Sequence, residues 1–292
     1  MQHYLDQTLF LLAEQLAALA LQEDVGRGDL TGSVLLPADA QATAELIIKR
    51  DGVLAGLQWL EIVFKRLDPD ARVQYEAVDG DRVRKGAVAA GVTCRQPALV
   101  AGERTALNLV QRLSGIATLT GRFMDAIEGT RAMVFDTRKT TPGLRAFEKY
   151  AVRCGGGANH RMGLYDEMMI KDNHLYLSGL SLPEAIARLR EAHPGKRLTA
   201  EAENLDEAKG AVDAGADIVL LDDFSLEDIR RAVEYRGLDD ADVQRTQLEV
   251  SGGVTLDNVA EYARTGVERI SVGAITHSAP ALDISLKVHK PG

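Results

Sequence analysis

Six short apolar runs, each ending in polar residues and each followed by a helix-like segment, constrain the fold most strongly. They cover residues 132–139, 167–173, 197–204, 217–223, 247–253 and 268–274. Comparable positions near their ends are Arg138, Lys171, Glu201, Asp222, Ser251 and Gly273, which are 33, 30, 21, 29 and 22 residues apart. Strand and helix alternating at this spacing predict parallel strands joined by crossover connections.

Six strands running in one direction favour a closed or nearly closed β/α barrel. Barrel enzymes place their active sites at the carboxyl ends of the strands. Four of the six end positions carry a charged side chain, and a ring would bring all six together. A doubly wound open sheet is the alternative, which the periodicity alone does not exclude.

The first hundred residues predict a separate α+β unit. Residues 4–20 have apolar side chains at helical spacing and predict a helix, and the segment around Trp59 and Leu67 predicts another. Residues 44–49 predict a strand, and residues 73–100 predict short antiparallel strands. A long helical pattern begins at Gly102 and is expected to cross into the second domain. We therefore predict an N-terminal domain over residues 1–105, a barrel over 106–278, and a tail, 279–292, that returns to the first domain.

Positive charge is concentrated in residues 136–174, against the trend of the chain. This segment contains seven Lys or Arg and five Asp or Glu, a net charge of +2, whereas the 292-residue chain has a net charge of −9. Clustered cations beside a Gly-rich turn suit an anionic ligand, because guanidinium and exposed backbone N–H groups bind carboxylate and phosphate oxygens. A solvated charged face is the plainer interpretation of such a run.

Composition excludes several classes of protein. The apolar content of 46% is ample for a large core, and no apolar run approaches the ~18 residues of a membrane span. The N-terminus lacks the basic start of a signal peptide. Two cysteines, Cys94 and Cys154, predict neither a disulfide framework nor a metal site, so we expect a cytoplasmic protein. The acidic balance argues against nucleic-acid binding.

Carboxylates at neighbouring predicted strand ends suggest a magnesium site. Glu201 and Glu203 end one run, and Asp222 and Asp223 end the next. Mg²⁺ prefers one or two carboxylates and completes its shell with water and substrate phosphate. The alternative is that these carboxylates only pair with the cations of residues 136–174.

Small residues end the last two runs, at 251–254 and 271–275. Late barrel strands often hold phosphate on backbone N–H groups, although Gly there also serves plain turns. His160 and His277 fall in predicted strand-end loops. Zinc-hydrolase and serine-hydrolase motifs are missing from the sequence.

Five segments together resemble the quinolinate phosphoribosyltransferase family. They are EDVGRGDLT, GERTALN, DTRKTTPGLR, EKYAVRCGGGANHRMGLYDEMMIKDNH and VGAIT. The resemblance implies an N-terminal α/β sandwich followed by an incomplete, seven-stranded β/α barrel. It implies transfer of phosphoribose from phosphoribosyl pyrophosphate to quinolinate, with loss of CO₂, to give nicotinate mononucleotide for NAD biosynthesis. It also implies a homodimer, or a multiple of dimers, in which Arg104 reaches the neighbouring subunit's site.

The resemblance assigns roles residue by residue. The quinolinate-binding residues are Arg104, Arg138, His160, Arg161 and Lys171. The phosphoribosyl pyrophosphate side takes Thr137, Lys139, Glu201, Asp222, Ser251, Gly252, Gly253, Gly273 and His277. Among these, Lys139, Lys171, Glu201 and Asp222 are implied to be catalytic, and Glu201 and Asp222 to hold Mg²⁺; no organic cofactor is implied. Asp223 departs from the family's frequent Asn and adds a negative charge beside the metal site.

Two other functions remain as alternatives. A same-fold relative would act on another base, as the molybdenum-transport-associated members do; they depart from the segments that stand here at 155–161 and 170–174. A non-catalytic anion-binding protein would keep the cations but has no need of paired metal ligands.

Overall fold

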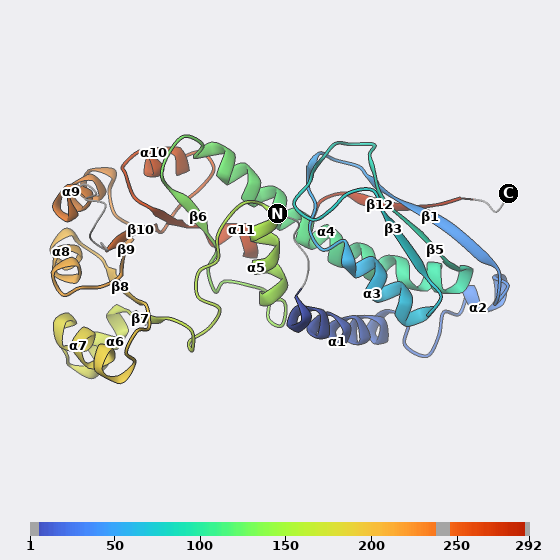
Figure 1. Cartoon of the computed structure of the whole chain (residues 1–292), viewed down its shortest axis with the longest axis horizontal. Helices are drawn as coiled ribbons and strands as arrows, with labels where there is room; N and C mark the ends of the chain where they lie inside the picture. Colours follow the sequence, from blue (N-terminus) through green and yellow to red (C-terminus); the bar gives the residue numbers. More distant parts are fainter. Residues whose placement is uncertain (1–5, 238–245, 290–292) are drawn as a thin grey trace. The chain divides into compact units, whose positions relative to one another are not determined.

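The computed structural model describes residues 6–237 and 246–289. The chain divides into two compact units, which we describe separately (Figure 1). The first comprises residues 1–121, 142–156 and 279–292, and the second comprises residues 122–141 and 157–278. In the described part of the chain, no helix is long and apolar enough to cross a membrane.

An antiparallel sheet forms the centre of the first unit, with strand order β12-β1-β5-β3. The strands are β1 (Gln41–Ile48), β3 (Arg72–Tyr75), β5 (Val88–Arg95) and β12 (Ile284–His289), and β2 (Gly52–Val53) pairs separately with β4 (Arg82–Val83). Side chains of β1 alternate between exposed and buried, because successive residues of a strand point to opposite faces. The pairing of β12 with β1 joins the C-terminal tail to this unit, as the sequence predicted.

Helices complete the first unit: α1 (Gln7–Asp24), α2 (Gly32–Leu35), α3 (Gln58–Leu67), most of α4 (Gln96–Ala126) and α5 (Arg145–Cys154). The predicted N-terminal helix is confirmed from Gln7; the expectation for residues 4 and 5 lies outside the described part. Helix α3 fully buries Trp59, Leu60 and Phe64, and burial of each such side chain contributes about 1.5–3 kcal/mol. Trp59 packs edge-to-face on Phe147 of α5, with ring centroids 5.1 Å apart.

The long helix α4 begins at Gln96, earlier than predicted, and Pro97 stands in its first turn. Proline suits this place because its missing N–H has no partner in the first turn of a helix. Polar side chains of α4 bind the first unit: Ser114 accepts the N–H of Ala55 at 3.0 Å, and Thr118 accepts that of Val53 at 2.9 Å. By its contacts α4 stays with the first unit to residue 121, beyond the boundary predicted after residue 105.

Helix α5 also belongs to the first unit, although the sequence analysis assigned it to the barrel. The buried Tyr150 donates a hydrogen bond to Asp79 at 2.7 Å, and burial followed by the charge of Asp79 raises the pKa of Tyr150. Arg112 of α4 pairs with the fully buried Glu148 at 2.8 Å. These long-range side-chain contacts place α5 in the first unit, and no local sequence pattern predicts them.

Six parallel strands form the second unit, in the order β6-β11-β10-β9-β8-β7. They are β6 (Met133–Phe135), β7 (Met168–Ile170), β8 (Leu198–Ala202), β9 (Ile218–Asp222), β10 (Gln247–Ser251) and β11 (Arg269–Ser271). Each lies inside one of the six predicted runs, which confirms the parallel arrangement. The expected seventh strand is reduced to a single parallel bridge between Phe135 and Ala158. No ladder among the described residues joins β7 to this segment, so the ring stays open.

Helices follow the strands along the chain: α6 (Asp172–Ser178), α7 (Leu182–Ala192), α8 (Leu205–Asp213), α9 (Leu226–Arg236), α10 (Val259–Ala263) and α11 (Ala274–His277). Helices α7, α8 and α9 lie outside strands β8, β9 and β10 (Figure 1). The predicted start at Ser181 is confirmed, since Glu184 accepts its N–H at 2.9 Å. Strands β8, β9 and β10 are buried except near their carboxyl ends, at Glu201, Asp222 and Ser251, and at the first residue of β10. The folding pattern therefore exposes polar side chains at one edge of the sheet.

We predict that both cysteine thiols are unreactive in the folded protein. Cys94 and Cys154 are free and buried; burial followed by the charge of Asp68 raises the pKa of Cys94 to about 11, and burial followed by the charge of Asp79 raises that of Cys154 to about 12. At pH 8 only about one thiol in a thousand, or fewer, is then ionised. A disulfide reagent should therefore label both only after denaturation. Rapid labelling of the native protein would contradict this packing.

Candidate active site

Polar residues from all six strand ends gather at the carboxyl edge of the parallel sheet. The strand register sets their relative height, since Ser251 of β10 lies directly beside Asp222 of β9, and Ser271 of β11 beside Phe135 of β6. The predicted residues of the second unit at or after these ends are Thr137, Arg138, Lys139, His160, Arg161, Lys171, Glu201, Asp222, Ser251, Gly252, Gly253, Gly273 and His277. Arg104 lies exposed on α4 in the first unit.

Lys171 and Glu201 form an ion pair across neighbouring strands. The Lys171 ammonium contacts Glu201 Oε2 directly; the Lys171 side chain is 44% exposed, whereas that of Glu201 is only 9% exposed. The sequence analysis placed these residues on opposite sides of a ligand, one as an anion clamp and the other as a metal ligand. The pair neutralises both charges, so a ligand that engages both groups must replace it.

The ends of β9 and β10 are interlocked through Asp223 and Gly252. Asp223 has a left-handed backbone with φ 55°, a conformation that Asp and Asn tolerate better than most residues, and its N–H donates to the Ser251 carbonyl at 3.0 Å. Gly252 has φ 92°, and a Cβ there would lie 3.0 Å from the Asp223 nitrogen and still closer to its carboxylate. Glycine is thus required for the close approach of these two turns.

Lys139, Gly273 and His277 lie together at the ends of β6 and β11. A Cβ on Gly273 would lie 3.1 Å from Lys139 Cδ and 3.3 Å from the His277 ring, so both side chains pass close over the glycine. Thr276 donates its hydroxyl to the Lys139 carbonyl at 2.8 Å, and Thr137 accepts the Lys139 N–H at 3.0 Å. The sequence analysis did not identify Thr276, whose only signal is its place inside the VGAIT motif.

Arg138 lies close enough to Arg161 to affect the ionisation of Arg161. Burial, and then the charge of Arg138, lowers the pKa of Arg161. Arg161 also donates to the Glu167 carbonyl at 3.3 Å. Arg161 is half-buried and Arg138 is exposed, and an anion bound between their guanidinium groups would offset the repulsion of the two charges.

The turn that carries His160 is held by Asp136. This buried carboxylate accepts the His160 N–H at 2.9 Å and the Asn159 side-chain amide at 2.6 Å. The His160 ring is itself buried: its Nδ1 accepts the N–H of Arg161 at 2.7 Å, and its Nε2 lies 3.4 Å from Glu249 Oε1. Both ring nitrogens therefore face protein groups. The ligand-binding role implied for His160 stays a prediction.

Sequence reasoning missed a buried charged cluster inside the sheet. Glu249 of β10 is fully buried and contacts His160, Arg269 and Ser271; Arg269 Nε lies 2.6 Å from Glu249 Oε2, and the Ser271 hydroxyl donates to Oε1. Burial alone would raise the pKa of Glu249, but these three partners lower it to about 2. The sequence offered one signal of this cluster: Glu249 and Arg269 are charged residues inside the otherwise apolar runs QLEVS and ERIS.

The donor set fits Mg²⁺ only with help from a ligand. Within residues 6–237 and 246–289, no three His, Cys, Asp or Glu side chains gather closely enough to hold a metal ion by themselves. Glu201 is largely buried and Asp222 is half-buried, and both lie near the ends of paired strands. Mg²⁺ commonly uses one or two carboxylates with water and phosphate oxygens, so these residues fit such an ion bound together with a phosphorylated ligand.

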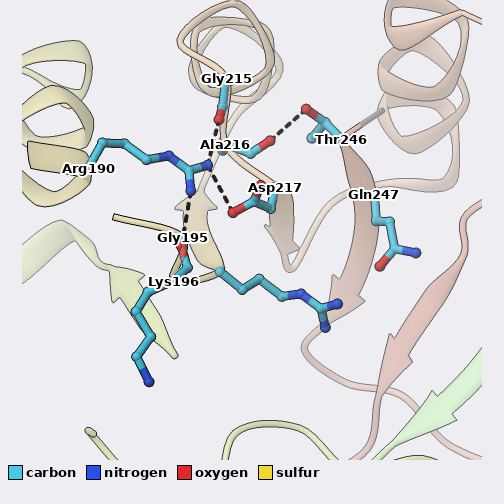
Figure 2. A pocket seen from close by; sticks show the side chains of 9 residues that line it. Arg190, Gly195, Lys196, Gly215, Ala216, Asp217, Thr246 and Gln247 are labelled. Atoms are coloured by element: carbon cyan, nitrogen blue, oxygen red, sulfur yellow. Dashed lines mark hydrogen bonds and ion pairs between the residues drawn. The ribbon is translucent and has the colours of Figure 1, made fainter. Parts of the chain in front are cut away.

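A hollow of about 600 Å³ lies at the opposite ends of strands β8, β9 and β10 (Figure 2). Arg190 extends into it and donates to the carbonyls of Lys196 and Gly215, each at 3.0 Å, and to Asp217 at 2.9 Å. The arginine joins the starts of the strands, where barrel proteins keep residues for stability rather than chemistry. This hollow contains none of the predicted site residues.

Fold and site together define an open β/α-barrel protein whose cations and carboxylates gather at the carboxyl ends of its strands. Residues 29–114 match the N-terminal domain, and residues 116–287 the C-terminal domain, of quinolinate phosphoribosyl transferase. The chain belongs to this family.

Individual relatives agree with this assignment. The chain is 41% identical to a probable nicotinate-nucleotide pyrophosphorylase [carboxylating] of Bacillus subtilis, over 91% of this chain and 90% of the relative. It is also 41% identical to the nicotinate-nucleotide pyrophosphorylase [carboxylating] of Mycobacterium leprae, over 91% and 94%. The structure resembles that of NadC from Streptococcus pyogenes, with a TM-score of 0.91, 38% identity, and coverage of 99% of this chain and 100% of that one.

We predict that Gly252→Ala is more destabilising than Gly253→Ala. Gly253 also has a left-handed backbone, φ 56°, but faces open space, so alanine there costs about 1–2 kcal/mol. At Gly252 the same strain is joined by a clash with Asp223, for a total of about 3 kcal/mol. Urea unfolding of both variants measures the difference. Equal losses would show that Asp223 moves freely and does not interlock the two turns.

Proposed function

We propose that this protein is a decarboxylating quinolinate phosphoribosyltransferase of NAD biosynthesis. It converts quinolinate and phosphoribosyl pyrophosphate into nicotinate mononucleotide, pyrophosphate and CO₂. One observation carries the proposal: a chain that matches both domains of the family gathers cations from β6 and β7 and carboxylates from β8 and β9 at one edge of its sheet. Anion clamps facing metal ligands suit a dicarboxylate acceptor and a diphosphate donor.

We assign the two carboxylates of quinolinate to Arg138, Arg161 and Lys171. Guanidinium groups bind carboxylates through two parallel hydrogen bonds, and the mutual repulsion of Arg138 and Arg161 falls when an anion lies between them. Lys171 adds a third cation once it leaves Glu201. Arg104, from the first unit of a partner subunit, is proposed to complete this set.

Lys139, His277 and the turns at 251–253 and 273 are proposed to bind the phosphoribosyl pyrophosphate. The left-handed glycines at 252 and 253 suit a turn that presents backbone N–H groups to phosphate oxygens. Lys139, held over Gly273, supplies a positive charge near the leaving pyrophosphate, where negative charge grows during the reaction.

Glu201 and Asp222 would hold the Mg²⁺ that accompanies the diphosphate. Bound there, the ion supplies charge neutralisation of the leaving group. The two carboxylates also lie where the ribose gains positive charge, which they stabilise electrostatically. The site is proposed to need no organic cofactor.

The chemistry proceeds in two parts. The ring nitrogen of quinolinate forms a bond to ribose C1 as the bond from C1 to pyrophosphate oxygen breaks, and pyrophosphate leaves with the electron pair. The positively charged pyridinium then accepts the electrons of the neighbouring carbon–carboxylate bond as CO₂ departs, and a proton takes the vacated ring position. Lys171, whose ammonium lies against Glu201, is a candidate source of that proton.

A homodimer is the proposed functional unit. Large apolar side chains stand exposed on the second unit: Leu164, Tyr165, Tyr176 and Leu177 are 75–87% exposed. Large apolar side chains exposed to this degree are common at interfaces between proteins. The exposed position of Arg104 on α4 agrees with a role in a neighbouring subunit. The free thiols of Cys94 and Cys154 support a reducing, cytoplasmic location.

A coupled assay tests the function. Purified protein is mixed with quinolinate, phosphoribosyl pyrophosphate and Mg²⁺, and CO₂ and nicotinate mononucleotide are followed, with nicotinate as the control base. Product and CO₂ from quinolinate alone are expected. Product only from another base would transfer the specificity to a different acceptor. Binding of both ligands without turnover would instead identify a non-catalytic relative.

We predict that Arg138→Ala weakens quinolinate binding on the order of 100-fold or more, because loss of a desolvated charged partner typically costs 2–5 kcal/mol. Arg188→Ala, which removes an exposed cation from α7, is the matched control and should bind normally. Calorimetric titration with quinolinate measures both. Near-normal affinity of the Arg138 variant would exclude this arginine from the carboxylate site.

We also predict that the double change Glu201→Gln, Asp222→Asn abolishes turnover together with its Mg²⁺ dependence, because the neutral amides no longer attract the ion. The control is Glu203→Gln, Asp223→Asn, which removes two carboxylates from the same strand ends. Turnover is measured against Mg²⁺ concentration, and binding of phosphoribosyl pyrophosphate by calorimetry. Full activity of the first variant would show that these carboxylates serve only the structure.

A further inference from the structure

A buried chain of polar contacts links the interior of the sheet to the predicted quinolinate site. It begins at Arg269, whose guanidinium stacks 3.6 Å from the centre of the Phe135 ring and whose Nε lies 2.6 Å from Glu249. Glu249 then faces the His160 ring at 3.4 Å, and His160 accepts the backbone N–H of Arg161. The side chains of Glu249, Arg269 and His160 are 0%, 5% and 6% exposed.

The contacts of His160 define where its proton lies. Nδ1 faces an N–H donor, the backbone of Arg161, at 2.7 Å, so this nitrogen must offer its lone pair. The ring proton is then on Nε2, which faces the Glu249 carboxylate. In a neutral imidazole one nitrogen donates and the other accepts, and the hydrogen bond of one nitrogen decides the state of the other.

Stability alone does not explain why a charge is buried at Glu249. A buried ion pair is costly to desolvate, and apolar residues of similar size often serve stability equally well. Its neighbours nevertheless keep this carboxylate ionised, since Ser271, Arg269 and His160 together lower its pKa to about 2 against the effect of burial. An ionised acceptor 3.4 Å from Nε2 favours the tautomer with the proton on that nitrogen and stabilises the orientation of the ring.

We propose that Glu249 is a positioning residue for quinolinate recognition. It keeps the ring proton of His160 on Nε2, and His160 then stabilises the loop that presents Arg161. The inference rests on the proposed function. Asp136 secures the other side of this turn through the N–H of His160 at 2.9 Å. Arg161 thereby keeps its place beside Arg138, where a carboxylate binds. Glu249 itself does not touch the substrate.

The test compares Glu249→Gln with Glu268→Gln. Glu268 lies immediately before β11, the strand that begins with Arg269, and its side chain is 12% exposed. It accepts hydrogen bonds from Arg131 at 2.5 Å, from Arg236 at 2.7 Å and from the Leu248 N–H at 2.9 Å. Both variants lose a partly or fully buried carboxylate of the second unit that pairs with arginine, so both are expected to lower the thermal midpoint. Only Glu249 contacts the site.

Quinolinate affinity and substrate kinetics separate positioning from stability. We expect Glu249→Gln to raise the quinolinate Kd and KM by about tenfold. This is the scale of loss seen when a residue that orients a metal ligand by a hydrogen bond is removed. The KM for phosphoribosyl pyrophosphate should change little. Glu268→Gln should change neither constant. Equal effects of the two variants on quinolinate would overturn the proposal, since they would trace to stability alone.

Imidazole nitrogen chemical shifts give a second measurement, made on the unaltered protein. In protein labelled with ¹⁵N histidine, with signals assigned through a His160→Asn variant, we expect His160 of the unaltered protein to show a protonated Nε2 and an unprotonated Nδ1 at neutral pH. The opposite tautomer would overturn the proposal. If the unaltered protein fails to bind quinolinate, the proposed function fails. The signals then still report the tautomer of His160, and a comparison with Glu249→Gln still decides whether Glu249 fixes it.

Discussion

Parallel pairing in register is the constraint on which the second unit depends. Every strand from β6 to β11 runs in the same direction, so every carboxyl end reaches the same edge. Residues as distant in the chain as Lys139 and Gly273 therefore meet. Because the interiors of β8 and β9 are almost wholly buried, their exposed polar side chains lie mainly where the strands end. The place of the chemistry follows from the hydrogen-bonding direction of the backbone.

Charge compensation determines what that edge binds. Inside the sheet, the buried charge of Glu249 is matched by that of Arg269. At the edge, Lys171 and Glu201 neutralise each other but are more exposed and so more easily exchanged for a ligand. Arg138 and Arg161 instead repel each other. Asp166 and Glu167 offset part of the charge on Arg161. Cations held in place before a ligand arrives stabilise an incoming anion without further reorganisation.

The route of the chain joins this edge to the other unit. Between residues 141 and 157 the chain leaves the second unit and supplies α5 to the first. The segments on either side of this excursion, 136–141 and 157–161, are the two that carry Arg138 and Arg161. Tyr150 and Glu148 bind α5 through Asp79 and Arg112. Stability of the first unit and placement of the two arginines are thus encoded in one continuous stretch of sequence.

The sequence by itself determined the six strands, their common direction, the expected edge, and nearly all the polar residues found there, because hydrophobic runs of regular spacing and polar run ends are local signals. Only the tertiary structure decided that α4 and α5 belong to the first unit, that the seventh strand is a single bridge at Ala158, and that Glu249 joins His160 to Arg269. Each of these depends on side chains brought together from distant positions. Burial and pairing of charge are properties of the packed core, and no local pattern of residues specifies which partner a buried charge will meet.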